Sequence, residues 1–238
     1  MRLFGEDYLY FWQPMLGDDR TDEEAELVWR LLALEPGVEV LDLACGYGRI
    51  ANRLAARGAR VVGLDATPSF LELARADAAA RGVEVEYVEG DMRAIPWRDR
   101  FDVVVNWFTS FGYHEDDELH AILRGVRETL RPGGRFLLET VHLPVLMLRF
   151  HDPSVRERDG DLLIERRRFD ALESKMLSDY VAVRGGEVRR YSIFIRMFTF
   201  TELRDWLLAA GFSEAAAYGR DGEPLSQEHL RMLVVARA

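Results

Sequence analysis

Short apolar segments alternate with longer amphipathic segments over the first 141 residues of the chain. Continuous apolar runs are typical of strands buried on both faces of a sheet, and apolar residues at helical spacing are typical of surface helices. The pattern predicts strands at 38–43, 60–64, 83–87, 101–105 and 135–141. It predicts helices at 21–35, 49–57, 67–80 and 116–130. Strands that alternate with helices indicate a parallel sheet with helices on both faces.

Local signals mark where these elements begin and end. Thr21 and Glu24 have capping-box spacing at the start of the first predicted helix. Near His142 the alternation stops, and residues 160–198 have the pattern of antiparallel strands, with Gly185-Gly186 as a two-residue hairpin signal. The last predicted elements are a helix from a cap at Thr201 to Gly211 and strands near 215–218 and 232–236.

These elements predict an α/β fold with a doubly wound, mostly parallel seven-stranded sheet. An antiparallel β insertion follows the fifth strand. We therefore expect one domain formed by residues 1–141 and 199–238, and an insertion over residues 142–198 that serves as a substrate cap or a dimer surface.

Composition narrows the classes of protein that fit. The 238 residues are 48% hydrophobic and 30% charged, which is typical of a globular protein, and no apolar run approaches the roughly 18 residues that a membrane span needs. The amino terminus lacks the features of a secretory signal, so we expect a cytoplasmic protein. A net charge of -10 argues against nucleic acid as a partner, and the single cysteine, Cys45, fits neither a disulfide nor a zinc site.

A glycine-rich segment directly follows the first predicted strand. Small residues at Ala44, Gly46 and Gly48 let the backbone approach a ligand closely, and the next helix points its amino terminus at that ligand. Taken alone, Gly46-x-Gly48-x-x-Ala51 also fits a dinucleotide-binding fingerprint.

Three acidic residues lie at the ends of the first three predicted strands. Asp42 suits a cationic amino group, and Asp65, about twenty residues after the glycines, suits both hydroxyls of a ribose. Asp91 can accept a hydrogen bond from an adenine amino group while Met92 packs on the ring. Asp42 and Asp65 also have a purely structural interpretation, as caps of the following turn and the following helix, and a structural role is open for Asp91 as well. Together they match a ligand that carries a cation, a ribose and an adenine.

The segments VLDLACGYGR, VVGLDATPSFLELA, EGDMRAIPW, FDVVVNWFTSFGY and LRPGGRFLLE resemble the successive motifs of class I S-adenosylmethionine-dependent methyltransferases. They span roughly residues 38–141, and the chain has Ala44 where the family usually has glycine. The resemblance implies S-adenosyl-L-methionine as cofactor and a small molecule as methyl acceptor. It also implies that Asn106 and Trp107 lie beside the methionine portion. The expected cofactor-binding set is Asp42, Ala44, Gly46, Gly48, Asp65, Ala66, Asp91, Met92, Asn106 and Trp107.

Methyl transfer from a sulfonium is an in-line displacement whose leaving group departs neutral, so positioning of an acceptor O or N atom dominates. A base matters only for a protonated acceptor. Tyr113, His114 and His142 follow the fourth and fifth strands, and they are the candidate catalytic residues on the acceptor side. The alternative for each is a structural role: capping or surface exposure for the histidines, packing for the tyrosine.

The insertion is richer in positive charge than the rest of the chain. Residues 156–196 contain ten basic and eight acidic residues. We expect Arg166, Arg168 and Arg196 to bind an anionic group of the substrate, with a solvated strand face as the alternative. The aromatic residues near the amino terminus, which form either a lid over the cofactor or simple packing, are Tyr8, Tyr10, Phe11 and Trp12.

Two other functions remain open at this point. A nicotinamide-dependent oxidoreductase shares the fold class, although the only lysine, Lys175, has Ala171 rather than tyrosine four residues before it. A cofactor-binding subunit without activity is the second alternative. The residues do not identify the methyl acceptor or the oligomeric state.

Overall fold

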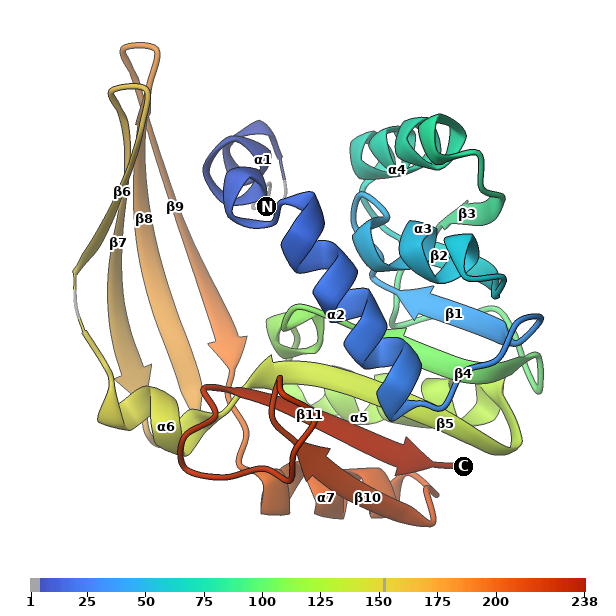
Figure 1. Cartoon of the computed structure of the whole chain (residues 1–238). Coiled ribbons are helices and arrows are strands. Elements are labelled where there is room, and N and C mark those ends of the chain that lie inside the picture. Colours follow the sequence, from blue (N-terminus) through green and yellow to red (C-terminus); the bar gives the residue numbers. More distant parts are fainter. Residues whose placement is uncertain (1–4, 152) are drawn as a thin grey trace.

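Two β-sheets lie beside each other in the computed structural model, which describes residues 5–151 and 153–238 (Figure 1). The larger sheet has seven strands in the order β10-β11-β5-β4-β1-β2-β3. They are β1 (Glu39–Leu43), β2 (Arg60–Asp65), β3 (Val85–Glu89), β4 (Phe101–Asn106), β5 (Leu130–Val141), β10 (Glu214–Tyr218) and β11 (Arg231–Arg237). The first five strands run parallel, while β11 pairs antiparallel with both β5 and β10. The mostly parallel seven-stranded sheet is therefore confirmed.

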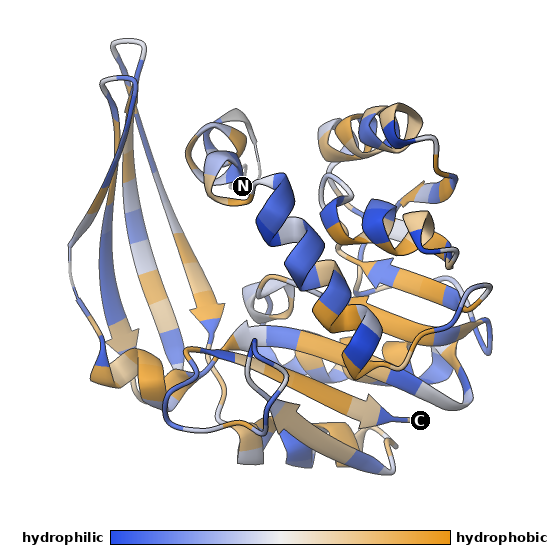
Figure 2. Cartoon of the chain, viewed as in Figure 1, coloured by the Kyte–Doolittle hydropathy of each residue, from blue (hydrophilic) through white to orange (hydrophobic). Residues whose placement is uncertain are grey.

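Helices cover both faces of this sheet because its central strands are apolar on both sides. Val104 of β4 packs with α5 (Asp116–Thr129) and α7 (Phe200–Ala209), whereas Val103 and Val105 pack with the opposite layer. That layer consists of α2 (Asp18–Leu31), α3 (Arg49–Ala56) and α4 (Pro68–Arg81). Figure 2 shows the resulting apolar strands between helices that are polar on their outer sides.

The second sheet contains four strands, and its antiparallel pairing is as the pattern over residues 160–198 predicts. They are β6 (Ser154–Arg158), β7 (Asp161–Asp170), β8 (Lys175–Arg184) and β9 (Glu187–Arg196). Gly185 and Gly186 form the turn between β8 and β9 with φ of +57° and +80°, which glycine adopts without strain. Figure 1 shows this sheet standing beside the large one, with the arrow of β5 ending next to it.

Short helices join the two sheets. The pattern predicted neither strand β6 nor four short helices, which are α1 (Glu6–Trp12), α6 (Leu143–Leu148) and the 3-10 helices η1 (Gln13–Met15) and η2 (Ser110–Tyr113). In Figure 1, α1 lies between the outer parts of the two sheets. Within the described part of the chain, no helix has the length and apolar character needed to cross a membrane.

Two predicted helix caps are wrong. Helix α2 begins at Asp18, one turn before Thr21, so Thr21 and Glu24 lie inside the helix and face the interior instead of forming a capping box. Helix α7 is capped by Thr199, whose hydroxyl accepts a hydrogen bond from the backbone N–H of Glu202, rather than by Thr201. In both cases the threonine lies close to the true start of the helix. Threonine favours the N-cap position, so the sequence alone does not show which nearby residue is the cap.

A candidate cofactor and acceptor site

A cavity of about 740 Å³ lies at the carboxyl ends of the parallel strands, where open α/β sheets bind their ligands. Its walls come from both sheets and from α1. The expected cofactor residues that line it are Asp42, Ala44, Gly46, Asp65, Ala66, Asp91, Met92 and Trp107. The acids at the ends of β1, β2 and β3 are thus gathered on one side of a single space.

The loop between β1 and α3 is tied to the end of β2 through Asp65. One carboxylate oxygen of Asp65 accepts a hydrogen bond from Gly46 N at 2.8 Å, and the other accepts from Thr67 N at 2.8 Å. Gly46 has φ of +56°, and a Cβ placed there would meet no protein atom closer than Phe70 at 4.0 Å. The space beside Gly46 therefore belongs to the cavity.

Two residues of the expected cofactor set support the cavity without lining it. A Cβ on Gly48 would lie only 2.9 Å from the Cβ of Ala74 and would also overlap the Tyr87 hydroxyl, so this glycine permits close packing. Asn106 is fully buried, and its Nδ2 donates to the backbone carbonyl of Leu43 at 2.8 Å. It joins the ends of β4 and β1 behind the cavity wall.

Asp42 is a buried carboxyl at the bottom of the glycine loop. It accepts a hydrogen bond from Ala51 N at 3.1 Å, so it also has the structural capping role. Burial raises the pKa of Asp42 to about 7, and the nearby charge of Asp65 adds to the increase. A cation in the cavity would favour its ionised form.

Asp91 follows β3 and is paired with Arg93. The Arg93 side chain donates to both oxygens of Asp91, including a 3.0 Å bond from Nε to each, and this pairing lowers the pKa of Asp91. Met92, between them, is buried and lines the cavity. The site therefore offers an apolar surface beside a carboxylate that is held in its charged form.

Two buried glutamates hold the cavity wall that is formed by the residues after β4. The sequence analysis did not assign either of them to the site. Glu24 of α2 accepts from Trp107 Nε1 at 3.0 Å and from Arg49 at 2.8 Å. Although burial raises the pKa of Glu24, the guanidinium groups of Arg49 and Arg220 hold it below its usual value. Arg220 also bonds Glu139 of β5 at 3.0 Å, which links the two glutamates.

The turn that follows β4 has an unusual backbone. Phe108 and Thr109 have φ of +63° and +66°, in the left-handed region that costs non-glycine residues energy. Phe108 N donates to the Glu139 carboxylate at 2.9 Å, and Arg231 donates to the Thr109 hydroxyl at 2.6 Å. Phe108 and Thr109 both line the cavity, so the buried network fixes the shape of this wall.

Tyr113 and His114, two of the expected catalytic residues, line the cavity. Burial raises the pKa of Tyr113, so its phenol stays neutral near pH 7. Burial lowers the pKa of His114, so its imidazole is also neutral there. The third, His142, does not line the cavity: its Nδ1 lies 3.1 Å from the carbonyl of His229 and it precedes α6.

The three expected substrate-binding arginines lie away from the cavity. Arg166 and Arg168 are exposed on one face of β7, and alternate residues of a strand point to opposite faces, so the cavity-lining Glu165 is on the other face. Arg196 is buried in ion pairs with Asp116, at 2.8 Å, and with Glu202. The residues that the second sheet turns toward the cavity are therefore not the three arginines that the sequence suggested.

The second sheet lines the cavity with one glutamate, one arginine, two tyrosines and two isoleucines instead. Its cavity-lining residues are Arg156, Glu165, Tyr180, Tyr191, Ile193 and Ile195. Among the aromatic residues near the amino terminus, Tyr8 and Trp12 line the cavity, while Tyr10 and Phe11 pack against the second sheet. The sequence analysis did not identify Glu165 as a residue of the cavity. The direction of its side chain depends on strand register, which no spacing in the sequence reveals.

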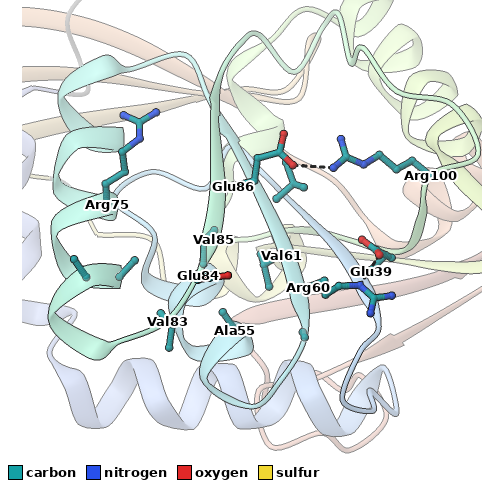
Figure 3. A pocket seen from close by; sticks show the side chains of 14 residues that line it. Glu39, Ala55, Arg60, Val61, Arg75, Val83, Glu84, Val85, Glu86 and Arg100 are labelled. Atoms are coloured by element: carbon teal, nitrogen blue, oxygen red, sulfur yellow. Dashed lines mark hydrogen bonds and ion pairs between the residues drawn. The ribbon is translucent and has the colours of Figure 1, made fainter.

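A second hollow, at the amino ends of β1, β2 and β3, has a different character (Figure 3). Four of its charged side chains form two ion pairs: Arg60 Nε lies 2.6 Å from Glu39, and Arg100 lies 2.8 Å from Glu86. This hollow is a solvated surface with ion pairs, at the end of the sheet opposite the glycine loop.

Residues 40–134 match a family described as a methyltransferase domain. Over most of its length the chain is also similar to the cypemycin N-terminal methyltransferase of a Streptomyces species, with 30% identity over 214 residues that cover 84% of this chain and 82% of that protein. The chain belongs to the class I S-adenosylmethionine-dependent methyltransferases. S-adenosylmethionine is the cofactor of this family, and the carboxyls and the open space beside Gly46 fit it.

Solved structures of methyltransferases share the whole fold. The CcbJ methyltransferase from Streptomyces caelestis has a TM-score of 0.79 and 25% identity, with 97% of this chain and 96% of that chain covered.

An uncharacterised methyltransferase of Synechocystis is 40% identical over 116 residues, which cover 48% of this chain and 51% of that protein. The chain thus spans about half the length of that relative.

Proposed function

We propose that this methyltransferase transfers a methyl group from S-adenosylmethionine to an N or O atom of a small molecule by in-line displacement. The observation that carries the proposal is that one cavity is lined both by the glycine loop and by side chains of the second sheet. A cofactor site alone would need only the large sheet.

The side of the cavity formed by the large sheet has the groups that the cofactor requires. Asp65 would accept hydrogen bonds from the ribose hydroxyls with the lone pairs that its two backbone contacts leave available. Asp42 would face the amino group, while Met92 and Asp91 would contact the adenine. Trp107 and the 108–109 turn would form the wall beside the methionine portion.

When bound, the cofactor supplies an electrophilic methyl group on a sulfonium. The work of this chain is to hold the acceptor in line with it and to exclude water. Tyr113 can orient an acceptor through its neutral hydroxyl, and neutral His114 can take up a proton that the acceptor releases. The name of the relative that methylates an amino terminus favours nitrogen over oxygen as acceptor.

The test is transfer of labelled methyl from S-adenosylmethionine to a panel of small amines, alcohols and carboxylic acids. We expect labelled product from the wild-type chain with at least one class, and none from Gly46→Val, in which the new side chain fills the cofactor space. Cofactor binding in calorimetry without transfer to any acceptor would instead support a binding subunit that lacks activity. Binding of NAD in place of S-adenosylmethionine would support an oxidoreductase.

A further inference from the structure

We propose that the second sheet forms a subsite for an organic ammonium group, so that the methyl acceptor is an amine held beside Glu165. This inference rests on the function proposed above and specifies its substrate class. It is carried by the position of a carboxylate among aromatic rings on the acceptor side of the cavity.

Strand register brings the subsite together. Ser154 of β6 is directly opposite Glu165 of β7, which is opposite Tyr180 of β8, which is opposite Tyr191 of β9. Residues in register share one face of a sheet, and Glu165, Tyr180 and Tyr191 all line the cavity. Three strands thus present one row of side chains to the cavity, and Ser154 of the fourth strand is next to Glu165 in the same row.

Hydroxyl groups hold the Glu165 carboxylate in place. Tyr180 Oη donates to it at 2.6 Å, Ser178 Oγ at 3.0 Å and Ser154 Oγ at 3.2 Å. Arg167 Nε forms a long ion pair with the carboxylate at 4.0 Å, which is beyond hydrogen-bond distance. Three neutral hydroxyls orient the carboxylate, and the long ion pair offsets its negative charge only in part, so a cation in the cavity would add to its stabilisation.

A chain of aromatic rings begins beside this carboxylate at Tyr180 and continues along the cavity wall. Tyr180 and Tyr191 are stacked with their centroids 5.1 Å apart, and the Trp12 ring meets Tyr180 edge-on at 6.0 Å. Tyr8 continues the wall by stacking on Trp12 at 5.7 Å. Faces of tyrosine and tryptophan rings attract organic cations, most strongly where water is excluded.

Three of the four arginines that line the cavity are paired with carboxylates. Arg49 is paired with Glu24, Arg93 with Asp91 and Glu118, and Arg231 with Glu139. Arg156 is one row nearer the tip of the second sheet, opposite Leu163, and its guanidinium lies over the Trp12 ring at 5.2 Å. Arg156 therefore already lies against Trp12, and the rings beside Glu165 that are left for a ligand cation are those of Tyr180 and Tyr191.

The charge changes of the reaction also favour an amine. The bound ammonium first releases one proton, which His114 takes up, and the freed lone pair forms the N–C bond. The C–S bond breaks and its electron pair stays on sulfur, so positive charge moves from sulfur to nitrogen. Glu165 and the rings stabilise that charge as it develops. An anionic acceptor would instead be repelled by Glu165.

The test uses three probes of similar shape: cyclohexylamine, cyclohexanol and cyclohexanecarboxylate. Each is titrated by NMR at pH 7 into the chain saturated with S-adenosylhomocysteine. We expect the amine to bind roughly tenfold or more tightly than the alcohol, and the carboxylate to bind most weakly. Glu165→Gln, which keeps the hydrogen-bonding shape, should reduce the preference for the amine to about twofold or less.

The matched control is Glu157→Gln on β6. Glu157 is exposed and pairs with Leu162, on the opposite face of the same sheet, so its substitution should leave the preference unchanged. Equal or absent binding of the three probes to wild type, or a preference that survives Glu165→Gln, would overturn the subsite. Loss of S-adenosylhomocysteine binding in Glu165→Gln would overturn it too, because Glu165 would then be part of the scaffold. Failure of the wild-type chain to bind S-adenosylhomocysteine would contradict the proposed function itself.

Discussion

At the residue scale, Asp65 has two tasks in the proposed cofactor site. It fixes Gly46 and Thr67 through backbone hydrogen bonds and would also bind the ribose. Replacing it with alanine removes charge-assisted hydrogen bonds worth about 1.5–3 kcal/mol, so Asp65→Ala should bind the cofactor at least about tenfold more weakly. Calorimetry with S-adenosylhomocysteine measures this directly, and unchanged affinity in a folded variant would rule out the assignment.

Asp42 should make cofactor binding depend on pH. Its pKa of about 7 means that the carboxyl is protonated below neutral pH and charged above it, and only the charged form attracts the cofactor's ammonium group. Affinity should therefore rise with pH and be about tenfold higher at pH 8 than at pH 6. Titrations of S-adenosylhomocysteine across this range should show a flat profile for Asp42→Asn. A flat wild-type profile would exclude a direct role for Asp42.

Gly46 and Gly48 belong to the same motif but should respond differently to substitution. Gly46→Val places a side chain in the cavity and should abolish binding while the chain remains folded. Gly48→Ala forces a contact with Ala74 and should lower thermal stability first. Melting curves with and without S-adenosylhomocysteine distinguish the two. If the ligand still stabilised the Gly46→Val chain, the loop would have to lie elsewhere.

At the element scale, much of the fold follows from local patterns. The strands β1, β2 and β4 are apolar runs, and Pro68 and Gly82 bound α4, so both kinds of element were predictable. Glu24 was misinterpreted because the same spacing serves a helix cap and a helix interior. The orientation of Glu165 was not predictable, since a shift of one residue in register turns every side chain of a strand to the other face.

Helix α1 should control access to the cofactor. Asp7 holds it to the second sheet through Arg189 at 2.7 Å and Arg184 at 3.4 Å, while Tyr8 and Trp12 line the cavity. Because these ion pairs are partly exposed, Asp7→Asn should speed the release of S-adenosylhomocysteine by about two- to fivefold. High salt screens the same ion pairs, so it should also speed the release of S-adenosylhomocysteine from the wild-type chain. If neither the substitution nor high salt altered the release rate measured by stopped flow, α1 would not limit the release of S-adenosylhomocysteine.

At the scale of the whole molecule, the two sheets have complementary tasks in this account. The large sheet gathers Asp42, Asp65 and Asp91 at the ends of its strands, which the motifs predicted. The second sheet turns an acidic and aromatic row toward the same cavity, whereas an anion-binding face was expected from its arginines. A single cavity lined by side chains of both sheets is the feature that, in this account, distinguishes a methyltransferase from a protein that only binds the cofactor.

The most direct test of that feature is a crystal structure of the chain with S-adenosylhomocysteine. We expect the ribose hydroxyls within hydrogen-bond distance of Asp65, the adenine against Met92, and the sulfur directed toward Tyr113 and Glu165 across the cavity. A ligand bound outside this cavity, or with its sulfur directed away from the second sheet, would contradict the account.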